Sequence, residues 1–235
     1  MGDLPAARVT ATRPFYTCGL DYAGPFLVKE KTRTRVSLKA YLCIFVCFTT
    51  KAVHLELTVD LSTDAFFNCL QRFIARRGKP GNIHSDNGTN FVGAKNELNE
   101  LGCLLSDKAH RSRITDAMSK DQIQWHMIPP HAPQFGGLWE SAVESAKYHL
   151  RRVIGETRLT FEELYTLLTQ VEACLNSRPL TSLSDDPNDP TPLTPRHFLI
   201  GDSMAAIPQP NFMDVPINRM NRYQHLSKMF QDFWK

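Results

Sequence analysis

Residues 129–152 read PPHAPQFGGLWESAVESAKYHLRR, in which a segment rich in proline and glycine leads into an amphipathic pattern. This stretch is the most informative part of the sequence, and its key residue is Glu140. Proline and glycine break regular structure, so we predict an irregular loop up to about Leu138 and a helix after it. On that helix the charged side chains fall within roughly 40° of the first of them: Glu140, Glu144, Lys147 and Arg151. The opposite face is apolar: Ala142, Ala146, Leu150 and Val153.

The charge pattern of this helix is suited to binding a metal ion and a polyanion. A carboxylate in the first turn, followed on the same face by cations, can hold a metal ion and guide a polyanion past it. The simpler alternative for this stretch alone is an ordinary amphipathic helix with a solvated charged face.

The composition indicates a globular protein with clustered positive charge. The 235 residues are 42% hydrophobic, which is enough for one sizeable domain with a core. The formal net charge is only +3, so the distribution of the cations says more than their sum. They form two clusters: Lys29, Lys31, Arg33, Arg35 and Lys39, and Arg72, Arg76, Arg77 and Lys79. Each cluster is either a solvated edge or a surface for an anionic partner.

Two features of the sequence indicate the cellular compartment: the pattern of the six cysteines and the absence of a long apolar run. The cysteines form no CxxC pair and several lie in apolar runs, so we predict buried thiols in a reducing compartment. No eighteen consecutive residues are apolar, and the N-terminus carries no secretion signal. We therefore expect a soluble, intracellular protein without a membrane partner.

The first half of the chain predicts three strands. Residues 15–22 form a first strand that ends at Ala23, Gly24 and Pro25 and has Asp21 at its end. Residues 38–48 are almost all apolar, which predicts a central strand buried on both faces. Residues 53–59 alternate between apolar and polar side chains, so we predict a half-exposed strand that forms a hairpin with the second one.

Helices and short strands alternate along the rest of the chain. Ser62 is a good N-cap for a helix that ends before Gly78, and Thr160 with Glu163 forms a capping box for a later one. Prolines after Leu180 exclude long regular elements until about residue 218, where a short helix is possible. Two more strands and one more helix are predicted: residues 82–85 and 124–128, and residues 92–105. The order predicts an α/β domain with a mixed sheet covered by helices.

Three acidic residues stand out by position. Asp21 and Asp86 each end a predicted strand, and Glu140 begins a helix after the last strand. Phosphoryl transfer requires such a group, because two divalent ions about 3.5–4 Å apart stabilise the attacking and leaving oxygens. Any one of the acids has a plainer explanation, and Asp86 before Asn87 and Gly88 is typical of a turn. Three together favour a metal site.

These residues carry a resemblance to a known family. GLDYAGPF around Asp21, HSDNGTNFVGA around Asp86 and PPHAPQFGGLWESAVESAKYHLR around Glu140 resemble, in order, the three acidic blocks of retroviral-type integrase catalytic cores. The chain looks closest to integrases of Pao/BEL-type LTR retrotransposons, because NSRPL at 176–180 and LTPRHFLIG at 193–201 resemble downstream blocks of that group.

The resemblance implies a ribonuclease H-like fold with a mixed five-stranded sheet flanked by helices. It implies a DDE enzyme in which Asp21, Asp86 and Glu140 bind two Mg²⁺ or Mn²⁺ ions. Such an enzyme processes the 3′ ends of retroelement DNA and joins them to target DNA, so DNA is the expected partner and the nucleus the expected site of action. Family members dimerise, so a homodimer or higher oligomer is expected.

Further residues are predicted to bind DNA. Lys147 and Arg151 share a helix face with Glu140 and are expected to contact phosphates, helped by Arg152 or the cluster at 29–39. The resemblance implies a contact from Gln134 to base or sugar. Gly136 and Gly137 give the loop before the helix its backbone freedom, so we predict that they act as a hinge that closes it over DNA, unless they only satisfy a turn.

The chain departs from the family pattern in two respects. Residues 87–139 separate the second and third acids, more than in retroviral enzymes, and the extra length fits a surface insertion at 105–122. No HHCC pattern precedes the core, and the chain ends within an apparent motif, so we expect a fragment or a degenerate copy. The predicted organisation is a lead-in at 1–13, a catalytic core at 14–201, and a proline-containing linker with the start of a C-terminal region at 202–235.

Two other functions remain open at this point. The chain could be a decayed or host-retained integrase that binds DNA or a partner without cutting. It could also be a ribonuclease H proper, although that family generally uses a further carboxylate and lacks the PQFGG loop found here.

Overall fold

The fold was analysed in a computed structural model of the whole chain. It describes residues 9–10, 12–30, 37–85, 123–127, 137–155, 157–180, 192–202 and 209–233. The chain divides into two compact units, one made of Met1–Phe26 with Lys39–Val143 and the other of Leu27–Leu38 with Glu144–Lys235.

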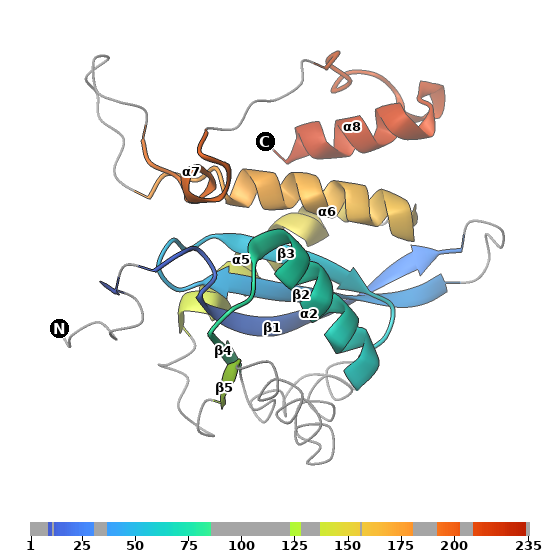
Figure 1. The fold of residues 1–235 in the computed structure, drawn as a ribbon. Helices are drawn as coiled ribbons and strands as arrows, with labels where there is room; N and C mark the ends of the chain where they lie inside the picture. Colours follow the sequence, from blue (N-terminus) through green and yellow to red (C-terminus); the bar gives the residue numbers. More distant parts are fainter. Residues whose placement is uncertain are drawn as a thin grey trace. The chain divides into compact units, whose positions relative to one another are not determined.

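The strands form a mixed β-sheet (Figure 1). Its strand order is β3-β2-β1-β4-β5, and β2 and β3 form an antiparallel hairpin. β4 is parallel to both β1 and β5. The strands are β1 (Thr17–Lys29), β2 (Ser37–Cys47), β3 (Val53–Thr58), β4 (Asn82–Ser85) and β5 (Gln124–Met127). This arrangement confirms the predicted α/β class and the mixed sheet. A sixth, two-residue strand that pairs with β1 joins the five strands predicted, so the described residues form a sheet of six strands.

The second strand confirms the sequence-based prediction most fully. β2 lies between β3 and β1, and its residues from Ala40 to Cys47 are all buried. A strand covered on both faces needs apolar side chains at successive positions rather than at alternate ones. The continuous apolar run therefore identified an interior strand correctly.

The first strand is longer than predicted. Ala23, Gly24 and Pro25 do not end it, and β1 continues to Lys29. Gly24 has a φ of 136°, a backbone angle that residues other than glycine rarely adopt, so glycine accommodates an irregular backbone inside the strand. Beyond it, Val28 pairs with Leu159 of the two-residue strand β6 (Leu159–Thr160). Asp21 consequently lies inside a long strand and not at its end.

The third strand is buried on both faces, so the prediction of a half-exposed strand is wrong. All six residues of β3 are buried, including His54 and Glu56. The alternation of polar and apolar residues is real, but helix α2 (Thr63–Arg77) covers the polar side. Burial of a carboxylate requires partners for its charge, and α2 supplies them.

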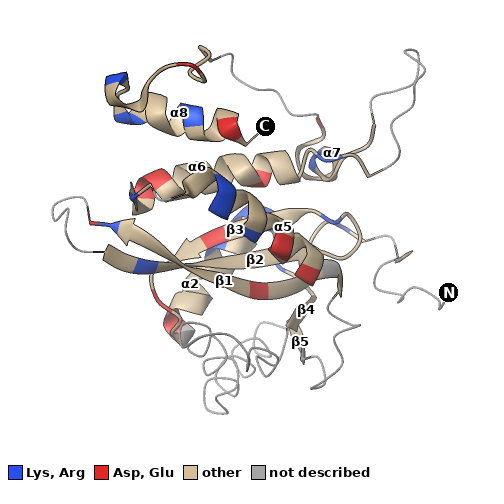
Figure 2. Ribbon diagram, turned by 180° about the vertical axis from the view of Figure 1, so that it is seen from behind, with Lys and Arg blue, Asp and Glu red and all other residues tan. Residues whose placement is uncertain are grey.

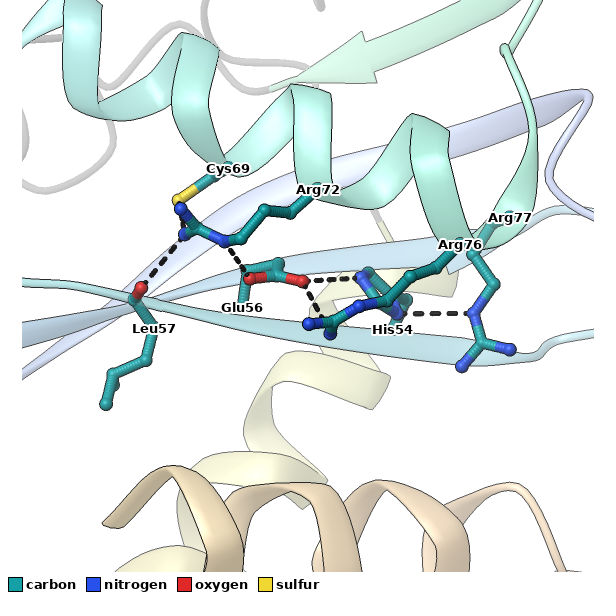
Figure 3. Close-up of polar contacts among 7 residues, drawn as sticks. All are labelled: His54, Glu56, Leu57, Cys69, Arg72, Arg76 and Arg77. Atoms are coloured by element: carbon teal, nitrogen blue, oxygen red, sulfur yellow. Dashed lines mark hydrogen bonds and ion pairs between the residues drawn. The ribbon is translucent and has the colours of Figure 1, made fainter. Parts of the chain in front are cut away.

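Glu56 is the centre of a charged cluster between β3 and α2 (Figure 3). Its side chain is fully buried and accepts hydrogen bonds from Arg72 Nε at 2.6 Å and Arg76 Nη1 at 2.9 Å. Arg77 Nε donates to His54 Nδ1 at 3.2 Å, so the other ring nitrogen of His54 carries the proton that faces Glu56 Oε1 at 3.1 Å. Burial alone raises the pKa of Glu56, but the hydrogen bonds from His54 and Arg72 outweigh it and hold the pKa below its ordinary value.

Helix α2 begins and ends where the sequence predicts. The side chain of Ser62 accepts a hydrogen bond from the backbone N–H of Ala65, and Gly78 ends the helix with a φ of 84°. On its inner side Phe73 stacks on Phe45 of β2 with 4.1 Å between ring centroids and contacts Phe15 edge-on. Aromatic pairs of this kind stabilise a fold beyond the area they bury.

The second unit contains helices. These are most of α5 (Gly137–Ile154), α6 (Phe161–Leu175), α7 (Pro195–Ile200) and α8 (Arg222–Asp232), with a short 3₁₀ helix at Ile217–Arg219. α6 starts with the predicted capping box: the Thr160 side chain accepts from the backbone of Glu163, and Glu163 accepts from the backbone of Thr160. On α5 the four residues of the predicted apolar face are buried: Ala142, Ala146, Leu150 and Val153.

Helix α8 lies alongside α6 (Figure 1). Arg222 joins the two helices through paired hydrogen bonds to the Glu163 carboxylate, at 2.6 Å from Nε and 2.5 Å from Nη2. Lys228 Nζ donates to the carbonyl oxygens of Met213 and Val215, which holds the preceding segment on α8. The sequence predicted only a possible short helix in this region.

The described cysteines are free and buried, as predicted: Cys18, Cys43, Cys47, Cys69 and Cys174. Among the described residues, none of the helices combines the length and the apolar character that a membrane crossing requires. The predicted helix at 92–105 and the polar segment that follows it lie outside the described residues.

Candidate active site

Asp21 lies inside β1, in the sheet next to β4. Its side chain is largely buried, at 9% exposure, and Oδ1 accepts a hydrogen bond of 2.7 Å from the backbone N–H of Tyr22. A largely buried carboxylate with a defined hydrogen bond has a restricted orientation, which suits a metal ligand.

The pairing of β1 with β4 bears directly on the second acid. The register pairs Gly19 with His84 and Leu20 with Ser85. The last pair directly precedes the two acids, because Leu20 is followed by Asp21 and Ser85 by Asp86. Ser85 is fixed in turn, because its hydroxyl accepts a 2.7 Å hydrogen bond from Trp125 Nε1 of β5. Asp86 itself lies outside the described residues, so its approach to Asp21 stays a prediction that this register favours.

Glu140 lies in the first turn of α5, as predicted, and its side chain is half-buried. The preceding residue, Trp139, is 2% exposed and packs against the bare backbone of Gly19 in β1. Gly19 and Asp21 lie two positions apart on β1, so they face the same side of the sheet. The first turn of α5 is thus held on β1 close to Asp21. Figure 2 colours the acidic positions of β1 and α5 red.

Aromatic rings hold Trp139 in place. It stacks on Phe48 at 5.7 Å between ring centroids, and Phe48 stacks on His84 at 4.8 Å. His84 also stacks on His126 of β5 at 4.6 Å. Burial, together with the nearby His126, lowers the pKa of His84 to about 4, so its ring is neutral at pH 7. This stack was not predicted from the sequence, although Trp139 directly precedes Glu140 and His84 lies two residues before Asp86.

The cations predicted to contact DNA have different surroundings on α5. Lys147 Nζ lies 3.1 Å from Glu144 Oε1, and the Lys147 side chain is only 16% exposed. Arg152 donates to the backbone oxygen of Asp232 at the end of α8. Arg151 is exposed. Of the three, Arg151 therefore has the surroundings that best fit a contact with a phosphate in solution.

Other predicted site residues are only partly described. Gln134 and Gly136 lie outside the described residues, as do Lys31, Arg33 and Arg35 of the first basic cluster. Gly137 is the first residue of α5, and a Cβ atom there would meet nothing within 4 Å. Packing therefore does not require glycine at position 137, which leaves the predicted hinge role open.

Asp21 and Glu140 are the candidate metal ligands that the structure describes. The two described acids offer carboxylate oxygens, the ligands that Mg²⁺ prefers. Within the part of the chain that the structure describes, no three His, Cys, Asp or Glu side chains are grouped so that they could hold a metal. The third predicted ligand, Asp86, lies outside that part. Asp21 and Glu140 fit an oxygen-liganded divalent ion, and a complete site needs Asp86.

Comparison with known proteins gives the family. The model of the integrase core domain family matches residues 11–133, a range that includes Asp21 and Asp86 and ends before Glu140. In the solved structure of a simian T-cell lymphotropic virus intasome in complex with the PP2A regulatory subunit B56 gamma, one chain is 16% identical with a TM-score of 0.53. That match covers 90% of this chain and 64% of the other, so this chain spans less than two thirds of its relative.

Two further matches are weaker. The HTLV-2 integrase catalytic core domain, solved with magnesium in a trimeric form, is 16% identical with a TM-score of 0.48, over 81% of this chain and 99% of that one. A curated protein of Enterobacter sp. (strain 638), undecaprenyl-phosphate 4-deoxy-4-formamido-L-arabinose transferase, is 32% identical over 87 residues, which are 37% of this chain and 25% of that protein. The intasome chain supports the fold alone. Because the family model covers more than half of its length, this chain belongs to the integrase core domain family.

Proposed function

We propose that this chain is the catalytic core of an enzyme that joins retroelement DNA to target DNA. In this proposal it first cuts a phosphodiester bond near the 3′ end of the element DNA, with water as the nucleophile. The 3′-hydroxyl that is released then attacks a phosphodiester bond of the target, and the new bond replaces the broken one. Element ends and a target duplex would be its substrates, and the nucleus its site of action.

The observation that carries the proposal is the packing of Trp139 on Gly19. This contact holds the first turn of α5, with Glu140, against the part of β1 that carries Asp21. The register of β1 and β4 supports the same position for Asp86. Membership of the integrase core domain family makes DNA the natural substrate class.

We assign Asp21, Asp86 and Glu140 as the ligands of Mg²⁺ or Mn²⁺. Divalent ions held by these carboxylates would supply charge stabilisation to the attacking and leaving oxygens of the displacement. The chain itself contributes orientation: the N–H of Tyr22 fixes the Asp21 carboxylate, and the aromatic stack fixes the start of α5. Arg151 lies on the α5 face of Glu140 and would bind a phosphate of the DNA.

The Pao/BEL subgroup is a further part of the proposal. The blocks PPHAPQFGGLWE, NSRPL and LTPRHFLIG support it. In this structure NSRPL follows the end of α6, and the LTPRHFLIG block forms α7 up to its C-cap, Gly201. We also propose that the protein acts as a homodimer or higher oligomer, as closed symmetric assemblies are common among soluble proteins.

The test is a cutting assay on a labelled DNA duplex that carries an element end, with and without Mg²⁺. We expect cutting that needs the metal, and a loss of at least about 100-fold when Asp21→Asn removes one ligand charge, because metal ligands and their orientation carry most of the rate. Asp64→Asn is the matched control, since Asp64 lies exposed in the first turn of α2. If wild-type protein binds the DNA but never cuts it, the non-catalytic alternative holds.

A further inference from the structure

Gly19 has no room for a side chain. A Cβ atom built there would lie 2.7 Å from Trp139 Cε3 and 2.8 Å from both Cδ2 and Cβ of Trp139. Carbon atoms in ordinary contact lie about 3.5–4.0 Å apart, so something must move if this position gains a methyl group. One of the three atoms is Trp139 Cβ, which is bonded to the helix backbone. Rotation of the indole ring alone cannot relieve that contact, so the backbone of β1 and that of the first turn of α5 must move apart.

The surroundings of Trp139 leave it little freedom to adapt. The ring is 2% exposed and stacks on Phe48, with an interplanar angle of 12°. The His84 ring is tilted against the Trp139 ring at 6.5 Å between centroids, and His84 is the residue of β4 that pairs with Gly19. Packed side chains of this kind transmit a displacement rather than absorb it. The contacts of Trp139 with Gly19, His84 and Phe48 therefore fix how closely its ring lies to the sheet.

We propose that Gly19 and Trp139 are positioning residues that set the separation between Asp21 and Glu140. Gly19 lies two residues before Asp21 on the same side of β1, and Trp139 directly precedes Glu140. The bare backbone at Gly19 fixes how closely α5 approaches the strand, and so fixes how closely the two carboxylates approach one another. The inference rests on the proposed function, because it assigns Asp21 and Glu140 to one metal site.

The test compares two glycine-to-alanine substitutions, one within β1 and one at the residue that precedes β4. Gly19→Ala presses on Trp139 and on the start of α5. Gly81→Ala is the matched control, because a Cβ atom there would lie 2.5 Å from Tyr16 Cζ, an equally severe contact at a distance from Glu140. Tyr16 is 42% exposed, so its ring can swing into solvent. The backbone angles of neither glycine exclude alanine.

For Gly19→Ala we expect a fall of about 100-fold in the cutting rate with Mg²⁺, because a displacement of about 1 Å is enough for such a loss. The KM for DNA should change little, since the predicted phosphate contact at Arg151 lies about three helical turns beyond Trp139 on α5. The loss should be smaller with Mn²⁺, because Mg²⁺ demands near-ideal octahedral geometry. Calorimetry should show weaker Mg²⁺ binding, and Gly81→Ala should match wild type in all four measurements.

A second variant covers the case in which Gly19→Ala does not fold. Trp139→Leu removes the stack on Phe48 without adding a steric clash. The indole Nε1 has no hydrogen-bond partner among the described residues, so the change leaves no partner unsatisfied. It should lower the rate with an unchanged KM for DNA. Suppose that the wild type cuts DNA and that folded Gly19→Ala or Trp139→Leu keeps the wild-type cutting rate and Mg²⁺ affinity. That result overturns this inference and leaves the proposed function standing. Wild type that neither binds Mg²⁺ nor cuts DNA overturns the inference together with the proposed function.

Discussion

At the scale of single residues, Glu56 shows how a buried charge organises its surroundings. The carboxylate is fully buried, whereas its arginine partners on α2 are about 40% exposed: Arg72 and Arg76. Burying one carboxylate is unfavourable on its own, and the arginines and His54 compensate for it through direct hydrogen bonds. Glu56 therefore ties the position of α2 on β3 to one specific arrangement.

Replacing Glu56 with Gln should lower the free energy of unfolding by about 2–4 kcal/mol at pH 7. The loss should be somewhat smaller than for a fully buried pair, because the arginines are half-exposed and water screens them. Urea unfolding followed by circular dichroism measures it. Glu162→Gln is the control, because Glu162 lies exposed in the first turn of α6, and it should change the free energy by less than about 0.5 kcal/mol.

The pH dependence of unfolding gives a second test of Glu56. Its pKa is lowered in the folded state, so its contribution is complete above about pH 4.3, the ordinary value for Glu, and is lost as the pH falls through the folded pKa. Wild type should lose more stability than Glu56→Gln between pH 5 and the acid transition, roughly the range in which carboxylates protonate. Identical pH profiles for the two proteins would contradict this role.

At the scale of elements, the contact between α6 and α8 depends on Arg222 and Glu163. The hydrogen bonds from Arg222 are the main reason why the pKa of Glu163 is about 2; burial acts in the opposite direction, and the N–H of Thr160 helps to lower it. One carboxylate thus completes the N-cap of α6 and holds the start of α8. The two roles share Glu163 Oε2, which accepts both from the N–H of Thr160 and from Arg222 Nη2.

Arg222→Ala should raise the pKa of Glu163 from about 2 towards the ordinary value of about 4.3. An NMR titration of the side-chain carboxyl carbon measures it. The bond contributes stability that is present above about pH 4.3 and is lost as the pH falls towards the folded pKa, and partial exposure limits it to about 1 kcal/mol. Arg219→Ala, a change at an exposed position, should leave the titration unchanged. A pKa that stays near 2 in Arg222→Ala would show that the cap alone lowers it.

The elements also show what the sequence could and could not predict. Periodicity and caps identified β2, α2, β4, α5 and α6, because these signals lie within each element. The length of β1 was missed, since Gly24 and Pro25 have the local signature of a strand end, whereas partners distant in the chain hold β1 to Lys29. The burial of Glu56 was missed for the same reason: its cover comes from arginines on another element.

The candidate site was predictable to a similar degree. Glu140 lies at a helix start as predicted, whereas Asp21, predicted at a strand end, lies inside β1. The contact between Gly19 and Trp139 could not be derived, because it joins residues of β1 and α5 that no local pattern relates. Contacts of this kind need the register of the sheet.

At the scale of the whole molecule, DNA affinity should depend on a few exposed cations. The net charge of +3 is small, so single phosphate contacts should make a measurable difference. Arg151 is exposed, whereas Lys147 is engaged by Glu144. The structure therefore refines the prediction that both contact DNA phosphates and favours Arg151.

Arg151→Ala should lower the affinity for DNA of any sequence and reduce the slope of log K against log salt by about 0.9, the value for one phosphate contact. Lys147→Ala should change the slope less, because its charge is already paired. Fluorescence anisotropy between low and moderate salt gives both slopes. Equal slopes for Arg151→Ala and wild type would place Arg151 on a merely solvated face of α5.

The central claim is that Asp21, Asp86 and Glu140 bind the same metal ions. Cleavage of the protein by radicals generated at bound Fe²⁺ tests it most directly, because the ion replaces Mg²⁺ and cuts the backbone beside its own ligands. With ascorbate and peroxide, mass spectrometry should find cuts near positions 21, 86 and 140 together, suppressed by excess Mg²⁺ and absent in Asp21→Asn. Cuts near only one of these positions, or a pattern that Asp21→Asn leaves unchanged, would contradict a shared metal site.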